Sequence, residues 1–217
     1  MNDTPQHSAE YKKEAEEGGI STLKLLVRKM AELSPGESGL IALDWWNGNR
    51  SILVDSDLSG VFVGMSLTTK PEEMFRALVE ATAFGCRAVI ENYNSHGVPV
   101  TDLTACGGIA VKDPVTMQIY ADVLGQEIRI AGSAHGPATG SAILAAYASG
   151  EYDTIAKASE HMGSLSDTVY RPIPHNVVVY NELYREYMKL HDYFGKDNNV
   201  MKKLKAIRSR ETVYKTL

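Results

Sequence analysis

A glycine pair at the end of an apolar run is the first segment whose residues could do chemistry. Residues 104–108 read Thr-Ala-Cys-Gly-Gly, and Asp113-Pro114 then predicts the start of a helix. Glycine has no Cβ, so a ligand can approach its backbone without a clash. Free N–H groups at a helix start favour phosphate or other polar ligand atoms. The same two glycines could also form an ordinary turn, so the segment alone leaves both interpretations open.

A second candidate segment, residues 44–50, reads Asp-Trp-Trp-Asn-Gly-Asn-Arg. Polar and aromatic residues gather here at the end of a predicted strand, a place where functional residues are often found. Asparagines that tolerate turn conformations explain the same string without any function. The residues we consider as contacts to a substrate are Asp44, Trp45, Asn47, Asn49 and Arg50.

Other reactive residue types do not form a recognisable site. The six histidines are scattered without an HExxH motif, and Cys86 and Cys106 do not form a CxxC pair. The sequence has no GxGxxG and no GxxxxGK[ST] motif. Ser133 and His135 are close in sequence but lack the GxSxG elbow of a hydrolase. We therefore assign no catalytic residue and no metal ligand.

Composition indicates an ordinary folded domain, with 44% hydrophobic and 23% charged residues among 217. The net charge of −5 argues against a nucleic-acid partner. Basic residues do cluster near the C-terminus, in a run we interpret as a solvated helix face. We find no apolar core of a secretory signal and no stretch of about 18 apolar residues. A soluble, cytoplasmic protein without nucleic-acid or membrane binding is therefore expected.

Predicted helices and strands, which must position these segments, alternate irregularly along the chain. Periodicity predicts helices over 8–17 and 20–33 and strands over 39–45, 51–54 and 61–67. The last two strands are interpreted as a hairpin. A long, largely buried helix should run from Pro71 to the turn at Gly97. Strands at 103–106 and 127–131 then alternate with helices at 113–124 and 137–149, and helices near 152–161 and 176–194 follow. This order predicts an α/β domain whose mixed sheet is flanked by helices, with a helical C-terminus.

Five segments together resemble the C-terminal domain of the FGGY carbohydrate kinases: residues 36–55, 76–91, 104–128, 137–150 and 179–195. The most specific pattern begins at Gly107-Gly108 and continues through Lys112, Met117-Gln118 and Ala121-Asp122 to Leu124-Gly125. The string at 44–50 is similar to the branch of the family that phosphorylates L-ribulose. The resemblance covers about residues 11–208.

The resemblance implies a ribonuclease-H-like, actin-type ATPase lobe. Residues 1–35 would be a helical lead-in, 36–195 the nucleotide-binding domain and 196–217 a basic helical tail. Gly107 and Gly108 would face ATP or ADP. Lys112 and Asp113 would lie beside them, at positions where relatives often carry asparagine. The implied nucleotide contact therefore rests mainly on the glycine backbone.

The resemblance also implies a reaction, the ATP- and Mg²⁺-dependent phosphorylation of L-ribulose to L-ribulose 5-phosphate in arabinose catabolism. In the family, the catalytic base, a phosphate-binding loop and most sugar contacts belong to a lobe that precedes these segments. The pentulose would bind through that lobe, and we expect this chain to be inactive alone. The alternatives are a kinase for another pentulose and a non-catalytic nucleotide-binding or scaffold module. A homo-oligomer is a further option, because the helices at 71–93 and 137–149 are too apolar for exposed surfaces.

Overall fold

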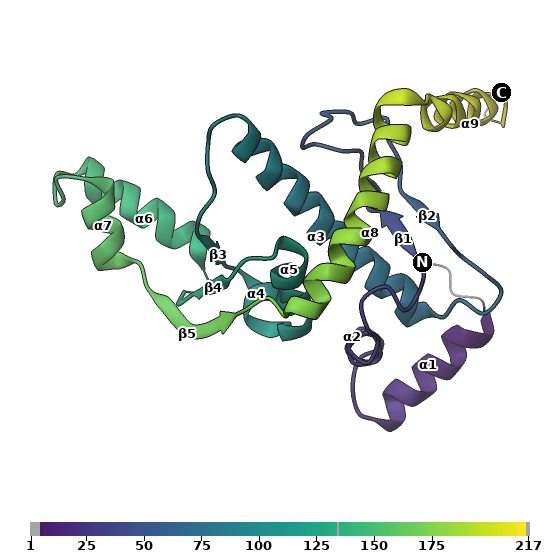
Figure 1. Ribbon diagram of the computed structural model, residues 1–217, viewed down its shortest axis with the longest axis horizontal. Coiled ribbons are helices and arrows are strands. Elements are labelled where there is room, and N and C mark those ends of the chain that lie inside the picture. The colour runs from purple at the N-terminus through teal and green to yellow at the C-terminus, as the bar shows by residue number, and fades with distance from the viewer. Residues whose placement is uncertain (1–4, 134, 216–217) are drawn as a thin grey trace. The chain divides into compact units, whose positions relative to one another are not determined.

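The computed structural model describes residues 5–133 and 135–215, shown in Figure 1 from purple at the N-terminus to yellow at the C-terminus. The chain divides into two compact units. Unit 1 comprises Met1–Gly97 and Val178–Leu217, and unit 2 comprises Val98–Val177. None of the described helices is both long and apolar enough to span a bilayer. The division into lead-in, nucleotide domain and tail stays a prediction.

Unit 1 contains one small sheet and most of the long helices (Figure 1). Its elements are α1 (Pro5–Glu17), α2 (Thr22–Ala31), β1 (Ile41–Leu43), β2 (Val61–Val63), α3 (Pro71–Ser95), most of α8 (Pro174–Asp192), the π-helical turn η1 (Tyr193–Asp197) and α9 (Val200–Lys215). Strands β1 and β2 are antiparallel, with Ala42 opposite Phe62. The predicted long helix is thus confirmed as α3.

The aromatic stripe of α8 forms the core of unit 1. Tyr180, Tyr184, Tyr187 and His191 are all buried. The ring of Phe84 on α3 lies 6.1, 5.9 and 5.2 Å from the three tyrosine rings, measured between centroids. Residues spaced by three or four positions share one helix face, so a single ring on α3 can reach all three. The stripe therefore serves to pack α8 on α3.

A buried ion-pair network joins three helices of unit 1. The Arg76 Nε of α3 lies 2.8 Å from Glu80 Oε1, and both side chains are almost fully buried. Arg76 also donates to the carbonyls of Met30 and Leu33, at 2.8 and 2.6 Å, at the end of α2. Tyr180 of α8 contacts both charges, 2.9 Å from Arg76 Nη2 and 2.9 Å from Glu80 Oε1. The network fixes α2 and α8 on α3.

Unit 2 is a three-stranded mixed sheet with helices. Its elements are β3 (Leu103–Ala105), α4 (Gly108–Lys112), α5 (Pro114–Leu124), β4 (Ile128–Ala131), α6 (Gly136–Ala148), α7 (Ile155–Met162) and β5 (Leu165–Tyr170). The strand order is β3-β4-β5, with β3 parallel and β5 antiparallel to β4. Strand–helix–strand order produces the parallel pair. The apolar core of the unit packs α5 against β4 through Met117, Ala121, Ile128 and Ile130.

Several residues of the family-like pattern in unit 2 have a structural role. Asp122 is buried and accepts hydrogen bonds from Ile173 N and Asn176 Nδ2, each at 2.8 Å. Gln118 donates to Asp122 Oδ1 at 2.9 Å. Asp122 thereby satisfies polar groups at the start of α8 that would otherwise lack partners. This part of the pattern maintains the fold.

Sequence analysis predicted one strand that the structure does not contain and missed two elements that it does contain. Residues 51–54 form no strand, and β2 pairs with β1 instead. Asn49 and Asp55 exchange two backbone hydrogen bonds of 2.8 Å, and Asn49 Oδ1 accepts from Leu53 N at 3.1 Å. This buried asparagine closes the segment into a loop. The short helix α4 and the largely exposed strand β5 were not predicted, because neither has a clear apolar period.

Candidate functional site

The glycine pair lies open at the end of strand β3. Gly107 has a φ of 92°, a backbone conformation that favours glycine. Gly108 follows as the first residue of α4. A Cβ built on either glycine would meet no other atom within 4 Å. The turn therefore requires a glycine only at Gly107, and the backbone of Gly108 is accessible to a ligand.

A second glycine-containing loop lies beside the pair. Because β3 and β4 are parallel, the loop after β4 leaves the sheet at the same edge as the glycine pair. A Cβ on Gly136 would lie only 2.8 Å from Cys106 Sγ, so the start of α6 packs directly on the residue before Gly107. The Ser133 hydroxyl holds this loop by accepting from His135 N at 3.1 Å. Sequence analysis considered Ser133 and His135 only as hydrolase residues and missed this loop, although it repeats the strand–glycine–helix pattern.

The residues that follow the glycine pair offer an apolar surface and a cation. Ile109 and Val111 are 65% and 54% exposed, so α4 presents two large aliphatic side chains to solvent. Lys112 is exposed at the end of α4. Asp113 is already used, because its carboxylate accepts from Thr116 N at 3.0 Å and from the Thr116 hydroxyl at 2.7 Å. Asp113 is thus the N-cap of α5, and a nucleotide contact from its side chain stays a prediction.

The residues predicted to contact a substrate are gathered in unit 1. Asp44, Trp45, Asn49 and Arg50 line a pocket of about 230 Å³, together with Tyr187 of α8 and part of α3. We name it the Asp44–Arg50 pocket. Asn47 lines a neighbouring pocket of about 340 Å³, which shares Asn49 and Arg50. The structure therefore brings the five predicted residues around one loop.

Trp45 and Tyr187 form the buried wall of the Asp44–Arg50 pocket. Trp45 is 3% exposed, and its ring meets the His191 ring edge-on at a centroid distance of 5.4 Å. Tyr187 is 1% exposed. The three- and four-residue spacing of Tyr187 with its neighbours is that of a core residue, and no sequence signal indicated that the core helix α8 also borders a pocket. The pocket thus has a rigid aromatic wall.

Two opposite charges line the Asp44–Arg50 pocket. Neither the Asp44 carboxylate nor the Arg50 guanidinium makes an ion pair or a hydrogen bond to another described residue. Burial raises the pKa of Asp44 above its ordinary value. Burial also raises the pKa of the Tyr187 hydroxyl, and the nearby Asp44 charge adds to this effect. At neutral pH the tyrosine is therefore a neutral hydroxyl group.

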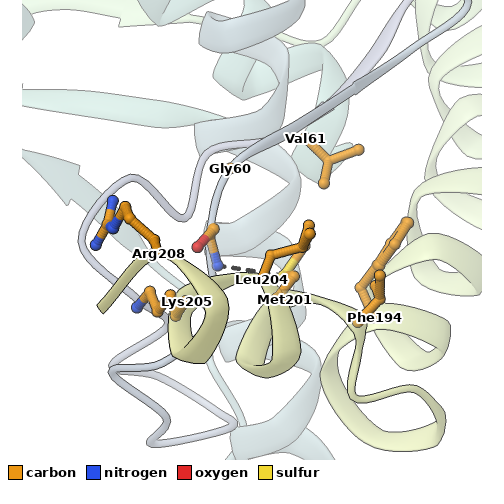
Figure 2. A pocket seen from close by; sticks show the side chains of 9 residues that line it. Gly60, Val61, Phe194, Met201, Leu204, Lys205 and Arg208 are labelled. Atoms are coloured by element: carbon orange, nitrogen blue, oxygen red, sulfur yellow. Dashed lines mark hydrogen bonds between the residues drawn. The ribbon is translucent and has the colours of Figure 1, made fainter. Parts of the chain in front are cut away.

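A third pocket in unit 1 contains none of the predicted residues. It has a volume of about 330 Å³ and lies where α9 packs on residues 59–61. Figure 2 shows its apolar side chains, among them Val61, Phe194 and Leu204, with Lys205 and Arg208 beside them. Lys202 of α9 contacts Asp55 at 2.6 Å, and Lys205 donates to the Ser56 carbonyl at 2.8 Å. Part of the basic cluster predicted to be solvated therefore anchors α9.

Over residues 5–133 and 135–215, no three histidine, cysteine, aspartate or glutamate side chains lie close enough to hold a metal ion.

Comparison with known proteins identifies the family. The profile of the FGGY family of carbohydrate kinases, C-terminal domain, matches residues 4–149. A ribulokinase from Bacillus licheniformis is 56% identical over 207 residues, which is 94% of this chain and 38% of that protein. A ribulokinase from Halalkalibacterium halodurans is 52% identical over 201 residues, covering 90% of this chain and 36% of that protein. The chain thus spans less than two fifths of the length of these curated relatives.

Solved structures agree on the fold. The xylulose kinase from Rhodospirillum rubrum superposes with a TM-score of 0.68 and 28% sequence identity. The match covers 83% of this chain and 36% of that protein. The predicted actin-type ATPase lobe is thereby confirmed as the fold class.

Proposed function

Because the chain belongs to the FGGY family of carbohydrate kinases, we propose that it is the nucleotide-binding part of a kinase that acts on L-ribulose. The reaction transfers the γ-phosphoryl group of ATP to the sugar, giving ADP and L-ribulose 5-phosphate. The choice of L-ribulose is supported by relatives named ribulokinase that are 56% and 52% identical to this chain. Another pentulose is the alternative acceptor.

The observation that carries the proposal is the open backbone of the glycine pair. Phosphoryl transfer depends on positioning and electrostatic stabilisation, so a kinase lobe needs a surface that holds ATP in a fixed place. At Gly107 and Gly108 no side chain blocks the backbone, and the loop before α6 packs beside it. The exposed aliphatic side chains of Ile109 and Val111 provide an apolar surface for the base.

The roles of Lys112 and Mg²⁺ follow from placing the nucleotide at the glycine pair. Lys112 would lie beside the adenine, and the glycine backbone would contact the nucleotide directly. Mg²⁺ would enter with ATP, since this ion is held largely by phosphate oxygens in nucleotide sites and keeps several of its waters. We assign no residue of the chain as a ligand of Mg²⁺.

Substitution of Gly108 tests the nucleotide site. We expect ATP and ADP to bind weakly, with NMR shifts centred on Gly107, Gly108 and Lys112 that change when Mg²⁺ is added. Gly108→Val should weaken binding about tenfold, which corresponds to about 1.4 kcal/mol, because its side chain would occupy the ligand space. The free energy of unfolding should change by only about 0.5 kcal/mol, since a Cβ at this position meets nothing.

The matched control is Gly140→Val in α6, another position where a Cβ meets no other atom within 4 Å. It introduces the same side chain into the same unit and should leave nucleotide affinity unchanged. The proposal fails if millimolar ATP produces no shift near the pair in the unmodified chain. It also fails if Gly108→Val lowers affinity only as far as it unfolds unit 2, because Gly108 would then serve the turn alone.

A further inference from the structure

The pocket beside helix α9 is used neither by the proposed nucleotide site nor by the residues predicted to contact a substrate. It is lined by residues 59–61, Phe194 and one face of α9, all of them in unit 1. We propose that this pocket, named here the α9 pocket, binds a small amphipathic anion with an apolar body that ends in one carboxylate. The inference does not rest on the proposed function, because no residue of the glycine loops lines this pocket.

The α9 pocket has an apolar end and a cationic end. Figure 2 shows Phe194 at one end and Lys205 and Arg208 at the other, with Leu204 between them. Positions 204, 205 and 208 lie three or four residues apart or side by side, so one face of α9 presents both the apolar and the charged side chains. A ligand that contacts both ends must therefore be apolar at one end and charged at the other.

The charge of the lining selects an anion. Lys205 and Arg208 both line the pocket, and no aspartate or glutamate is among the described residues that do so. Lys205 Nζ donates to the carbonyls of Ser56 and Leu58 at 2.8 and 3.3 Å, which uses two of its three donors. Its distance to Asp57 Oδ1 is longer, at 3.9 Å, and the Asp57 side chain is 68% exposed. The charge and the third donor of Lys205 therefore remain available to a ligand carboxylate.

Exposed aliphatic side chains supply the other half of the site. Leu204 is 60% exposed and Val200 is 36% exposed, although both line the pocket. Covering such apolar area is favourable, by about 25 cal/mol per Å² removed from water. The volume of about 330 Å³ is at the lower end of the range of about 300–1,000 Å³ typical of ligand pockets. The α9 pocket thus suits a small molecule with an apolar body.

Contacts outside the ligand space hold the walls of the pocket in place. Met201 is 4% exposed, and its Sδ accepts from Ser59 N at 3.2 Å. Lys202 Nζ lies 2.6 Å from Asp55 Oδ2 and does not line the pocket. These contacts join α9 to the loop opposite it before any ligand arrives. A preformed site loses less conformational freedom when it binds, so a small ligand can gain measurable affinity there.

The experiment measures binding to the full chain by NMR of its methyl groups at low salt, because salt screens charge interactions. The probes are 4-phenylbutyrate, the neutral analogue 4-phenylbutan-1-ol, and inorganic phosphate as an anion without an apolar body. We expect 4-phenylbutyrate to shift the methyl signals of Val61, Met201 and Leu204. The alcohol should bind at least tenfold more weakly, because it forgoes the charged contacts, and phosphate should leave these methyl signals unchanged.

Variants separate the charged contact from the apolar one. Arg208→Gln should weaken binding of 4-phenylbutyrate about fivefold, the upper value for an exposed ion pair, and leave binding of the alcohol unchanged. Lys203→Gln is the matched control, because it removes one positive charge from an exposed position of the same helix that does not line the pocket. Leu204→Ser should weaken both ligands by the same factor. Circular dichroism checks that each variant is folded.

Four outcomes would overturn the proposal. The first is that 4-phenylbutyrate leaves the methyl signals of Val61 and Leu204 unchanged. The second is that the alcohol binds as tightly as the carboxylate. The third is that Lys203→Gln lowers affinity as much as Arg208→Gln, since the effect would then be one of overall charge. The fourth is self-association in sedimentation that Leu204→Ser abolishes, because a second copy of the chain would then occupy the pocket.

Discussion

Arg76 shows how one buried charge can hold several elements together. It contacts Glu80, two carbonyls at the end of α2, and the hydroxyl of Tyr180, so its removal leaves several buried partners unsatisfied. Removing one member of such a pair typically costs about 3–5 kcal/mol. We expect Arg76→Ala to lower the free energy of unfolding by this amount in urea denaturation. Lys189→Ala, which breaks the exposed pair with Glu186, should change it by less than about 1 kcal/mol.

The pH dependence of the Arg76→Ala variant provides a second test. Burial raises the pKa of Glu80, and the Arg76 charge opposes that shift. Without Arg76, the pKa of Glu80 should rise further in the folded state. A carboxyl whose folded pKa is raised adds stability that is present at low pH and lost as pH rises through that pKa. Arg76→Ala should therefore cost less at pH 5 than at pH 7, and an equal cost at both values would contradict the assignment.

Among helices, the capping of α5 separates a structural role from a nucleotide role. Asp113 accepts from both the amide and the hydroxyl of Thr116 at the start of this helix. Asp113→Ala should lower the free energy of unfolding of unit 2 by about 1 kcal/mol, the typical value for a lost N-cap. Asp113→Asn should retain most of the cap, because an asparagine oxygen can accept the same bond.

Nucleotide titrations of the same two variants decide what else Asp113 does. If the residue only caps α5, Asp113→Asn should bind ATP as the unmodified chain does. A loss of affinity in Asp113→Asn, with stability unchanged, would assign the carboxylate to the nucleotide site instead.

The predictable elements are those with a long apolar period or clear end signals. α3, α5 and α6 were predicted within a few residues, because proline marks their starts and Gly97 and Gly125 follow two of their ends. Residues 51–54 read as a strand because Ile52, Leu53 and Val54 are apolar, yet a buried asparagine side chain closes this segment into a loop. This hydrogen bond joins residues only four positions apart and competes with strand pairing, but the apolar pattern of residues 52–54 does not reveal it.

The candidate site likewise has features that the sequence could predict and features that it could not. The glycine pair and the residues around Arg50 could be proposed from residue types at strand ends. The loop before α6 repeats the same residue pattern, but its packing on Cys106 could not be predicted, since that packing depends on the parallel pairing of β3 and β4. The contribution of Tyr187 to a pocket was hidden as well, because its spacing is that of a core residue.

At the scale of the whole molecule, helix α6 presents apolar side chains that could contact another protein surface. Ile143 is its one buried residue among those described, while Leu144 and Tyr147 are 55% and 44% exposed. Apolar surface of this kind commonly binds another protein surface. A second copy of the chain and a preceding kinase lobe are both candidates, and the oligomeric state stays a prediction that sedimentation analysis can test.

Catalysis by the isolated chain is the corresponding functional prediction. We expect no L-ribulose-dependent release of ADP from Mg-ATP, because the family resemblance places the catalytic base in a preceding lobe and Asp113, the carboxylate that follows the glycine pair, is bonded to Thr116 as the cap of α5. Loss of a general base alone costs about 10²–10⁴-fold in rate. Adding the preceding lobe of a ribulokinase should restore turnover. Turnover by the chain alone would contradict this prediction and would make Asp44 a candidate for the base.

The adjacent residues Trp45 and Trp46 are the two tryptophans of the chain, and they lie in opposite surroundings. Trp45 is 3% exposed and borders the Asp44–Arg50 pocket, whereas Trp46 is 59% exposed. Their fluorescence should therefore separate into a blue-shifted emission from Trp45 and a red-shifted emission from Trp46. Iodide in solution can quench Trp46 selectively, since it cannot reach a buried indole. The fluorescence that remains after quenching comes from Trp45 in the pocket wall. The protein therefore carries an intrinsic fluorescent reporter of ligand binding in this pocket.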